Sequence, residues 1–199
     1  GIQTVHDVLV ITKPSKELIK EALKRDGNLF YILTNSRSFS EEETIAYHIK
    51  LMNMILEAGK ETGIDVIVVS RGDSTLRGHY PLENEVMKEV FEQFGVSIDG
   101  EIICPYLDGI RSTENDIHYV VNHGEKIPCG ESEFAKDKTF GYKSSDLKEY
   151  VEEKSKGRFL AKDCISITLD ELKKQDIQSI LKKLNTVKDF HKVIVNATC

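Results

Sequence analysis

Residues 65–81 read DVIVVSRGDSTLRGHYP, the most informative stretch of this chain. The run from Asp65 to Ser70 is rich in Val and Ile, which predicts a buried strand. The polar residues after it predict a loop, and Pro81 suits the first turn of a helix that should end near Phe94, before Gly95. A strand that leads through a polar loop into a helix is the repeating unit of an α/β protein.

The same alternation extends along most of the chain. We expect further strands at 7–12, 29–34, 102–104, 165–168 and 192–197, and further helices at 15–24, 40–60, 145–154 and 170–184. An S-x-x-E capping box opens the second of these helices, whose apolar face includes Ile45, Ile49, Met52 and Ile55. This order predicts an α/β fold, a mostly parallel sheet flanked by helices on both faces.

One region departs from the alternation. Between about 106 and 143 the periodicity weakens, and residues 117–124 read as a β-hairpin closed by Asn-His-Gly. We interpret this region as a β-rich insertion within a single α/β domain that covers residues 1–199.

Composition excludes several classes of protein. The 199 residues are 40% hydrophobic and 30% charged, with a net charge of −6, and no apolar run approaches the roughly 18–20 residues of a membrane helix. Collagen-like, disordered and transmembrane classes are excluded, and the charge does not favour nucleic acid as a partner. Neither nucleic acid nor membrane is therefore expected as a partner.

The four cysteines, at 104, 129, 164 and 199, lack the spacing of a zinc site or a redox dithiol. We favour reduced thiols in a cytoplasmic protein over two disulfides in a secreted one.

Both ends of the sequence resemble points of truncation. The sequence lacks an initiator Met, enters an apolar strand almost at once, and closes on VIVNATC, a core-strand pattern. We therefore expect a fragment of a longer protein.

Two predicted strands end in unusually polar loops, at residues 34–38 and 70–79. In an open parallel sheet, ligands bind beyond the carboxyl ends of the strands. Backbone N–H groups of a glycine-containing loop can bind an anion, and arginine binds a carboxylate or phosphate with two bonds. Asp73 could accept hydrogen bonds from sugar hydroxyls or act as a base. The alternative is an ordinary surface loop whose Ser and Asp cap the next helix.

Other candidates carry less information. Arg111 follows the strand at 102–104 and could reach the same edge, although a plain turn explains it as well. Neither G-x-x-x-x-G-K-[ST] nor G-x-G-x-x-G occurs, so no nucleotide site is indicated. The six histidines show no metal spacing, and we interpret them as surface or hairpin residues; no metal site is expected.

At these loops the chain resembles the four-carbon acid sugar kinase family, long described as a domain of unknown function. Residues 1–8 resemble the segment after the D-D-x-T-G opening of that family, with Gly1 as its glycine. The other matching segments are NSR at 35–37, RGDSTLRG at 71–78, the C-P, G-R and H-Y-V pattern within 104–120, and ESEFAKD at 131–137. The match runs in order over nearly the whole chain.

The resemblance implies an ATP-dependent kinase that phosphorylates the 4-hydroxyl of threonate, erythronate or an oxo-tetronate. This chain would be most of its N-terminal, substrate-binding domain. ATP and Mg²⁺ would be bound mainly by a C-terminal nucleotide-binding domain of the same polypeptide, with no cofactor held by this chain. A homodimer is left open.

The resemblance also implies which residues bind the sugar acid, and the catalytic residue stays unknown. The residues that it implies are Arg37, Arg71, Gly72, Asp73 and Ser74, with Arg77 supporting their loop and Asn35 and Arg111 as further candidates.

The sequence departs from the family at several points. The Asp-rich opening and the C-terminal domain are absent, Arg71 stands where Lys is common, and Gly141 stands where Pro is common. We therefore expect the fragment alone to be inactive. Two other functions stay open: a non-enzymatic α/β binding or sensor domain for small carboxylates, and an interaction module whose arginine loops contact an acidic partner.

Overall fold

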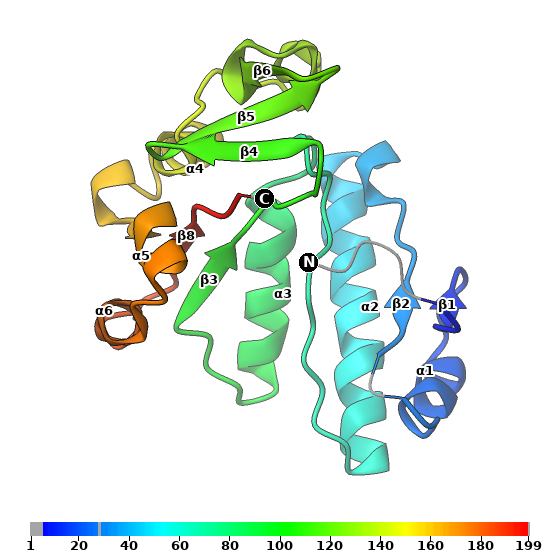
Figure 1. Cartoon of the computed structure of the whole chain (residues 1–199). Helices are drawn as coiled ribbons and strands as arrows, with labels where there is room; N and C mark the ends of the chain where they lie inside the picture. The colour runs from blue at the N-terminus through cyan, green and yellow to red at the C-terminus, as the bar shows by residue number, and fades with distance from the viewer. Residues whose placement is uncertain (1–5, 28, 199) are drawn as a thin grey trace. The chain divides into compact units, whose positions relative to one another are not determined.

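The computed structural model describes residues 6–27 and 29–198 (Figure 1). They form two compact units: residues 6–71 and 82–97 make the first, and residues 72–81 and 98–198 make the second. Residues 1–5, on which the family resemblance opens, lie outside the described residues, as does Cys199. The predicted α/β class, with parallel sheets flanked by helices, is confirmed.

The first unit combines a small parallel sheet with helices. Its elements are β1 (Val10–Ile11), α1 (Lys16–Leu23), β2 (Tyr31–Ile32), the 3₁₀ helix η1 (Ser36–Ser38), α2 (Glu41–Thr62) and α3 (Leu82–Gln93). Strands β1 and β2 pair in parallel, and α2 packs against both α1 and α3. A core of side chains from these elements, including Ile19, Met52 and Val90, is almost fully buried.

The predicted capping box begins α2. The Ser40 side chain accepts a bond from Glu43 N at 3.1 Å, and the Glu43 carboxylate accepts one from Ser40 N at 2.8 Å. Gly63 ends the helix with φ +69°, a conformation that favours glycine. The local capping signal therefore predicted the start of this helix, which extends two residues beyond its predicted end at 60.

The buried face of α2 differs in part from the prediction. Met52 and Ile55 are buried as expected, but Ile49 is 41% exposed. Thr44 and His48 are buried on this helix instead. The inward face therefore carries two polar side chains near the helix start.

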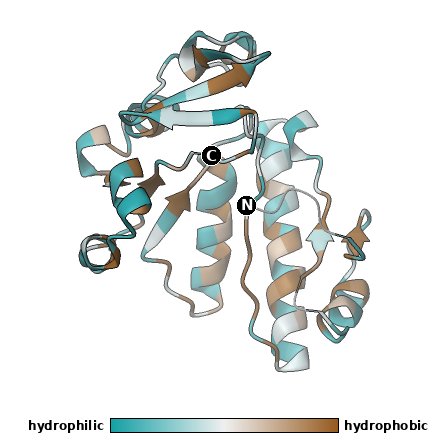
Figure 2. Cartoon of the chain, viewed as in Figure 1, coloured by the Kyte–Doolittle hydropathy of each residue, from teal (hydrophilic) through white to brown (hydrophobic). Residues whose placement is uncertain are grey.

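The predicted strand at 65–70 is wrong. Residues 64–70 form neither a helix nor a strand, because within the described part of the first unit they have no ladder partner, which a strand requires. Val66 and Val68 pack against the core, whereas Ile67 is 91% exposed and Val69 is 71% exposed. Figure 2 shows this segment, the trace that follows α2, in the hydrophobic colour.

The second unit contains a three-stranded parallel sheet in the order β3-β8-β7. Its strands are β3 (Gly100–Ile103), β7 (Ile165–Ile167) and β8 (His191–Val195), and its α-helices are α4 (Leu147–Lys154), α5 (Leu169–Lys174) and α6 (Ile177–Leu184). Three short 3₁₀ helices are η2 (Cys129–Glu131), η3 (Glu133–Lys136) and η4 (Ala161–Asp163). The parallel pairing agrees with the predicted fold class.

A buried ion pair joins two strands of this sheet. Glu101 of β3 stands opposite Lys192 of β8, and Lys192 Nζ lies 2.6 Å from Glu101 Oε2. The Lys192 side chain is only 1% exposed, and its Nζ lies 3.5 Å from the ring centre of Phe190 and 4.2 Å from that of Phe159. The charge is thus enclosed by a carboxylate and two aromatic faces.

The single helix predicted at 170–184 is wrong, since the structure has α5 and α6 there. Gln175 adopts φ +53°, and its N–H closes α5 by bonding to carbonyls of the preceding turn. The Asp176 side chain then caps α6 by accepting a bond from Ser179 N at 3.0 Å. A new cap directly after a left-handed residue divides the helix.

The predicted β-rich insertion contains an antiparallel sheet, β4-β5-β6 (Figure 1). Its strands are β4 (Arg111–Glu114), β5 (Ile117–Asn122) and β6 (Glu125–Pro128). The turn between β5 and β6 uses His123 and Gly124, both with positive φ, as the Asn-His-Gly signal predicts.

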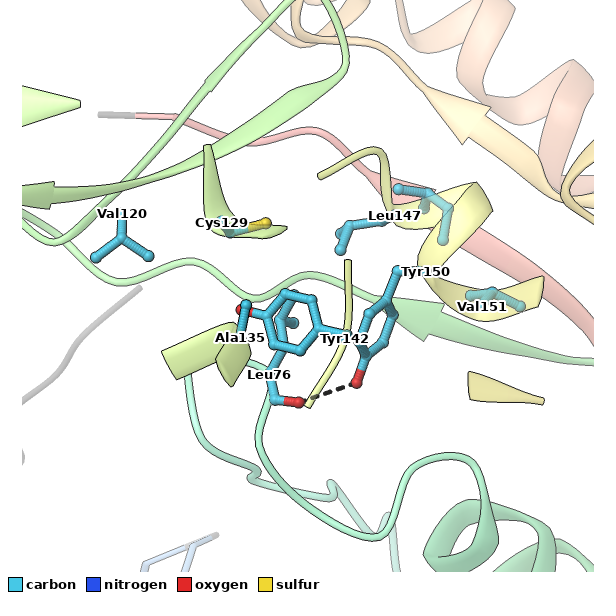
Figure 3. Close-up of a cluster of buried hydrophobic side chains, with 9 residues drawn as sticks. Leu76, Val120, Cys129, Ala135, Tyr142, Leu147, Tyr150 and Val151 are labelled. Carbon is cyan, nitrogen blue, oxygen red and sulfur yellow. Dashed lines mark hydrogen bonds between the residues drawn. The ribbon is translucent and has the colours of Figure 1, made fainter. Parts of the chain in front are cut away.

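The core of the second unit includes Leu76 from the 72–81 segment. This side chain lies in one buried cluster with Val120, Cys129, Tyr142 and Tyr150, among others (Figure 3). The 72–81 segment is thus anchored in the same core as elements later in the chain.

Candidate functional site

The loop at 73–77 in the second unit is built around one carboxylate. Asp73 Oδ1 accepts bonds from Thr75 N at 2.9 Å and Thr75 Oγ1 at 2.7 Å. Asp73 Oδ2 accepts a bond from Arg77 Nε at 2.9 Å and lies 2.8 Å from Arg77 Nη2. A carboxylate offers about four acceptor sites, so these contacts use most of its capacity.

These contacts set the charge of Asp73. Burial opposes ionisation, but the hydrogen bonds from Thr75 and the positive charge of Arg77 outweigh burial and lower the pKa of this carboxyl below its ordinary value. Asp73 is therefore an anion at neutral pH. A carboxylate with a lowered pKa is a weak base, and its chemistry here is to accept hydrogen bonds.

Arg77 is held on two sides. Besides its pair with Asp73, its guanidinium carbon lies 4.9 Å from the ring centre of Phe134. Ser74, at the head of the turn, is half-buried, and Gly72 is exposed. The loop therefore presents the Ser74 hydroxyl near a fixed guanidinium–carboxylate pair, and an exposed glycine precedes it in the chain.

Two tyrosines that no sequence signal singled out also bond to this loop. Tyr142 Oη donates to Thr75 O at 2.9 Å. Tyr150 Oη donates to Leu76 O at 3.0 Å, and Figure 3 shows this second bond. Both belong to the second unit.

Two of the other arginine candidates, Arg37 and Arg71, lie in the first unit. Arg37 is exposed within η1, which follows Asn35 at φ +53°. Ser36 Oγ donates to Glu83 Oε1 at 2.6 Å and so ties η1 to the start of α3. Arg71, the last residue before the second unit begins at Gly72, is exposed.

The predicted site residues are therefore divided between the units. Asn35, Arg37 and Arg71 belong to the first. The second contains Gly72, Asp73, Ser74, Arg77 and Arg111, and of these the described contacts bring together Asp73 and Arg77.

Arg111 lies in a buried polar network of the second unit. Its side chain is among the largest that are fully buried, and its Nη2 lies 3.4 Å from His118 Nδ1. His118 Nε2 lies 2.8 Å from Asn196 Oδ1, and Asn196 Nδ2 donates to Asp116 Oδ1 at 2.7 Å. Because arginine can only donate, Nδ1 accepts and Nε2 carries the proton of a neutral imidazole.

The interpretation of the histidines as surface or hairpin residues is wrong for two of them, His48 and His79, which are buried outside the hairpin. His118 belongs to the hairpin as interpreted, but it is only 2% exposed. His79 packs edge-on against Phe140, with ring centres 4.9 Å apart. Burial of a histidine depends on contacts far along the chain, which spacing cannot reveal.

His118 makes stability depend on pH. Burial lowers its pKa from 6.5 to about 4, Arg111 acts in the same direction, and the bond to Asn196 opposes them. Between these pKa values the unfolded chain binds more protons than the folded one, so stability falls as the pH drops from 6.5 towards 4. We expect a loss of about 3 kcal/mol over this window, measured by urea unfolding at several pH values.

The matched control is His123, which is exposed in the turn of the same hairpin. His118→Gln should lose this part of the pH slope, and His123→Gln should keep it. Equal slopes in both variants and the unsubstituted protein would contradict the assignment.

The described residues hold neither a metal-binding cluster nor a membrane-spanning helix. No group of three or more His, Cys, Asp and Glu side chains in residues 6–27 and 29–198 is arranged to hold a metal ion. Over the same residues, every helix is too short or too polar to cross a bilayer. Cys104, Cys129 and Cys164 are free thiols.

The whole chain, residues 1–199, matches the family model described as the sugar-binding N-terminal domain. The protein belongs to this family, and the resemblance to the N-terminal domain of four-carbon acid sugar kinases is confirmed at the level of the family. No curated protein sequence matches the chain.

Two solved structures share the fold. A domain of unknown function (DUF1537) from Bordetella bronchiseptica, crystallised with bound citrate as a domain-swapped dimer, is 17% identical with a TM-score of 0.59 over 96% of this chain. A Haemophilus influenzae protein assigned to the same DUF1537 family is 15% identical with a TM-score of 0.65 over 95% of this chain. The chain spans 41% of the length of each of them.

Proposed function

We propose that this chain is the substrate-binding domain of an ATP-dependent kinase that phosphorylates the 4-hydroxyl of a four-carbon sugar acid, such as threonate, erythronate or an oxo-tetronate. The observation that carries the proposal is the match of the whole chain to the sugar-binding N-terminal family. The Bordetella neighbour, which was crystallised with a small carboxylate, supports a ligand of this chemical class.

The loop at 73–77 supports the same ligand chemistry. A sugar acid offers one carboxylate and several hydroxyls, which suit guanidinium donors and hydroxyl or carboxylate partners. Asp73 pairs with Arg77 and accepts a hydrogen bond from Thr75 N, and Ser74 supplies a hydroxyl between these residues in the turn. We assign Arg71, Gly72 and Arg37 to the binding of the acid as well, with Asn35 and Arg111 as further candidates.

The contribution of this chain to phosphoryl transfer is to bind and orient the acceptor. The oxygen of the 4-hydroxyl would bond to the γ-phosphorus, the bond from that phosphorus to the bridging oxygen of ATP would break with release of ADP, and the hydroxyl proton would pass to solvent. Such reactions depend mainly on positioning and charge neutralisation. We assign ATP and Mg²⁺ to a C-terminal domain of the same polypeptide and to no residue of this chain. A cytoplasmic location belongs to the same proposal, and a homodimer is an assembly to test.

The test uses the full-length protein that carries this chain. Threonate or erythronate should raise its melting temperature, and one of them should drive ATP consumption in a coupled assay. Arg37→Ala should lose the thermal shift, because its exposed guanidinium is a proposed carboxylate ligand, whereas Arg25→Ala, an exposed arginine of the same unit, should keep it.

The outcomes separate the candidate functions. Stabilisation without ATP consumption would favour the non-enzymatic binding or sensor domain for small carboxylates. Stabilisation by no four-carbon acid would overturn the proposal altogether.

A further inference from the structure

The conformation of the 73–77 loop depends on donors from outside it. The carbonyls of two consecutive residues, Thr75 and Leu76, accept bonds from Tyr142 Oη at 2.9 Å and Tyr150 Oη at 3.0 Å. In Figure 3 the Tyr150 hydroxyl points to the Leu76 carbonyl, with the Tyr142 ring beside it. Two side chains thus fix adjacent peptide units of one loop.

The loop needs such support because its backbone is strained. Leu76 has φ +65°, a left-handed conformation that costs a residue other than glycine roughly 1–2 kcal/mol. Its N–H bonds to Asp73 O at 2.9 Å, which closes the turn that places Asp73 opposite Arg77. A strained conformation persists only where the surrounding contacts determine it.

The two tyrosines are themselves rigid. Tyr142 is 4% exposed and Tyr150 is 2% exposed. Their rings meet edge to face with centres 5.3 Å apart, and Tyr80 stacks on Tyr150 at 5.5 Å. Tyr142 N bonds to Ala135 O at 3.0 Å. Neither hydroxyl can therefore follow the loop if the loop moves.

Both hydroxyls stay protonated at neutral pH. Burial raises the pKa of Tyr142 to about 12 and raises the pKa of Tyr150 further. Each tyrosine is consequently a donor, which is the role that a backbone carbonyl requires.

We propose that Tyr142 and Tyr150 are positioning residues for the sugar-acid site: their hydroxyls hold the 73–77 loop in its binding-competent conformation. This inference rests on the proposed function, because it takes the loop as the part of the second unit that binds the acid. Without the hydroxyls, the loop would have to be ordered at the moment of binding, which lowers affinity.

The test compares Tyr142→Phe and Tyr150→Phe in the full-length protein. Each change removes one hydroxyl and leaves a buried carbonyl without its donor. Amide exchange of the peptide that covers residues 72–80 should become about tenfold faster, and the dissociation constant for threonate or erythronate should rise about tenfold. In the coupled assay KM for the acid should rise while KM for ATP stays unchanged.

The matched control is Ser155→Ala. Ser155 is 1% exposed, belongs to the same unit, and its hydroxyl bonds to the backbone of Phe159 and Glu152. This variant should lose thermal stability as the tyrosine variants do, yet exchange at 72–80 and affinity should stay at their unsubstituted values. A general loss of stability therefore cannot reproduce the expected pattern.

The outcomes distinguish the inference from the proposed function. If the unsubstituted protein binds neither acid, the proposed function fails, and exchange at 72–80 still decides whether the tyrosines hold the loop. If the unsubstituted protein binds an acid and both phenylalanine variants exchange or bind as it does, the inference is overturned.

Discussion

Replacing Asp73 with alanine is expected to abolish the stabilisation of the full-length protein by threonate and erythronate. The Asp73 carboxylate accepts bonds from Thr75 N and Thr75 Oγ1 and pairs with Arg77, so its loss frees the turn and the guanidinium together. Groups that are no longer preorganised must be ordered during binding, which reduces affinity. Thermal shift and calorimetry with each acid measure the effect.

A smaller change and a matched control sharpen this experiment. Asp73→Asn keeps one oxygen that can accept from Thr75, but its amide nitrogen cannot accept from Arg77, so binding should weaken without vanishing. Asp137 closes a similar turn in the same unit, because its Oδ1 accepts from Thr139 N at 2.9 Å. Asp137→Ala should keep the ligand-induced shift. An unchanged shift in Asp73→Ala would show that this carboxylate has no part in binding.

Replacing Glu101 with alanine is expected to destabilise the protein by about 3–5 kcal/mol, because Lys192 would keep a buried charge without its carboxylate partner. Lys192 Nζ lies 2.6 Å from Glu101 Oε2, and the lysine side chain is 1% exposed. The aromatic faces of Phe190 and Phe159 do not replace a full negative charge. Urea unfolding at neutral pH measures the loss.

Two comparisons test the cause of this loss. The double variant Glu101→Met with Lys192→Met removes both charges, and it should recover much of the stability because no unpaired charge stays buried. Glu114→Ala breaks the pair between Glu114 and Lys126, whose side chains are 52% and 45% exposed, and should have a much smaller effect. Equal losses in Glu101→Ala and Glu114→Ala would contradict the role of burial.

The elements that the sequence predicted well depend on contacts between residues close in the chain. The Ser40 capping box and the turn after β5 each involve a few consecutive residues, so their chemistry is visible locally. The strand expected at 65–70 depends on a ladder partner, which no local pattern can supply. The break at Gln175 was not predicted because glutamine favours a helix.

The candidate site shows the same division. The polar loop at 71–78 stood out by composition, and its Asp73–Arg77 pair is an i,i+4 contact. Tyr142 and Tyr150 bond to carbonyls 67 and 74 residues earlier. A tyrosine in a buried pattern is read as core, because no spacing marks a donor to so distant a carbonyl.

These long separations also set an order of events during synthesis. Residues 73–77 leave the ribosome well before the residues that hold them, so the nascent loop lacks both anchoring bonds until Tyr142 and Tyr150 have been added. The second unit consists of residues 72–81, which precede α3 in the sequence, and residues 98–198, which follow it. It therefore cannot fold completely before the later residues have been synthesised. Contacts between residues far apart in the sequence form late, because bringing them together costs the conformational entropy of the intervening chain. The loop is translated early but acquires its shape only after most of the chain has emerged.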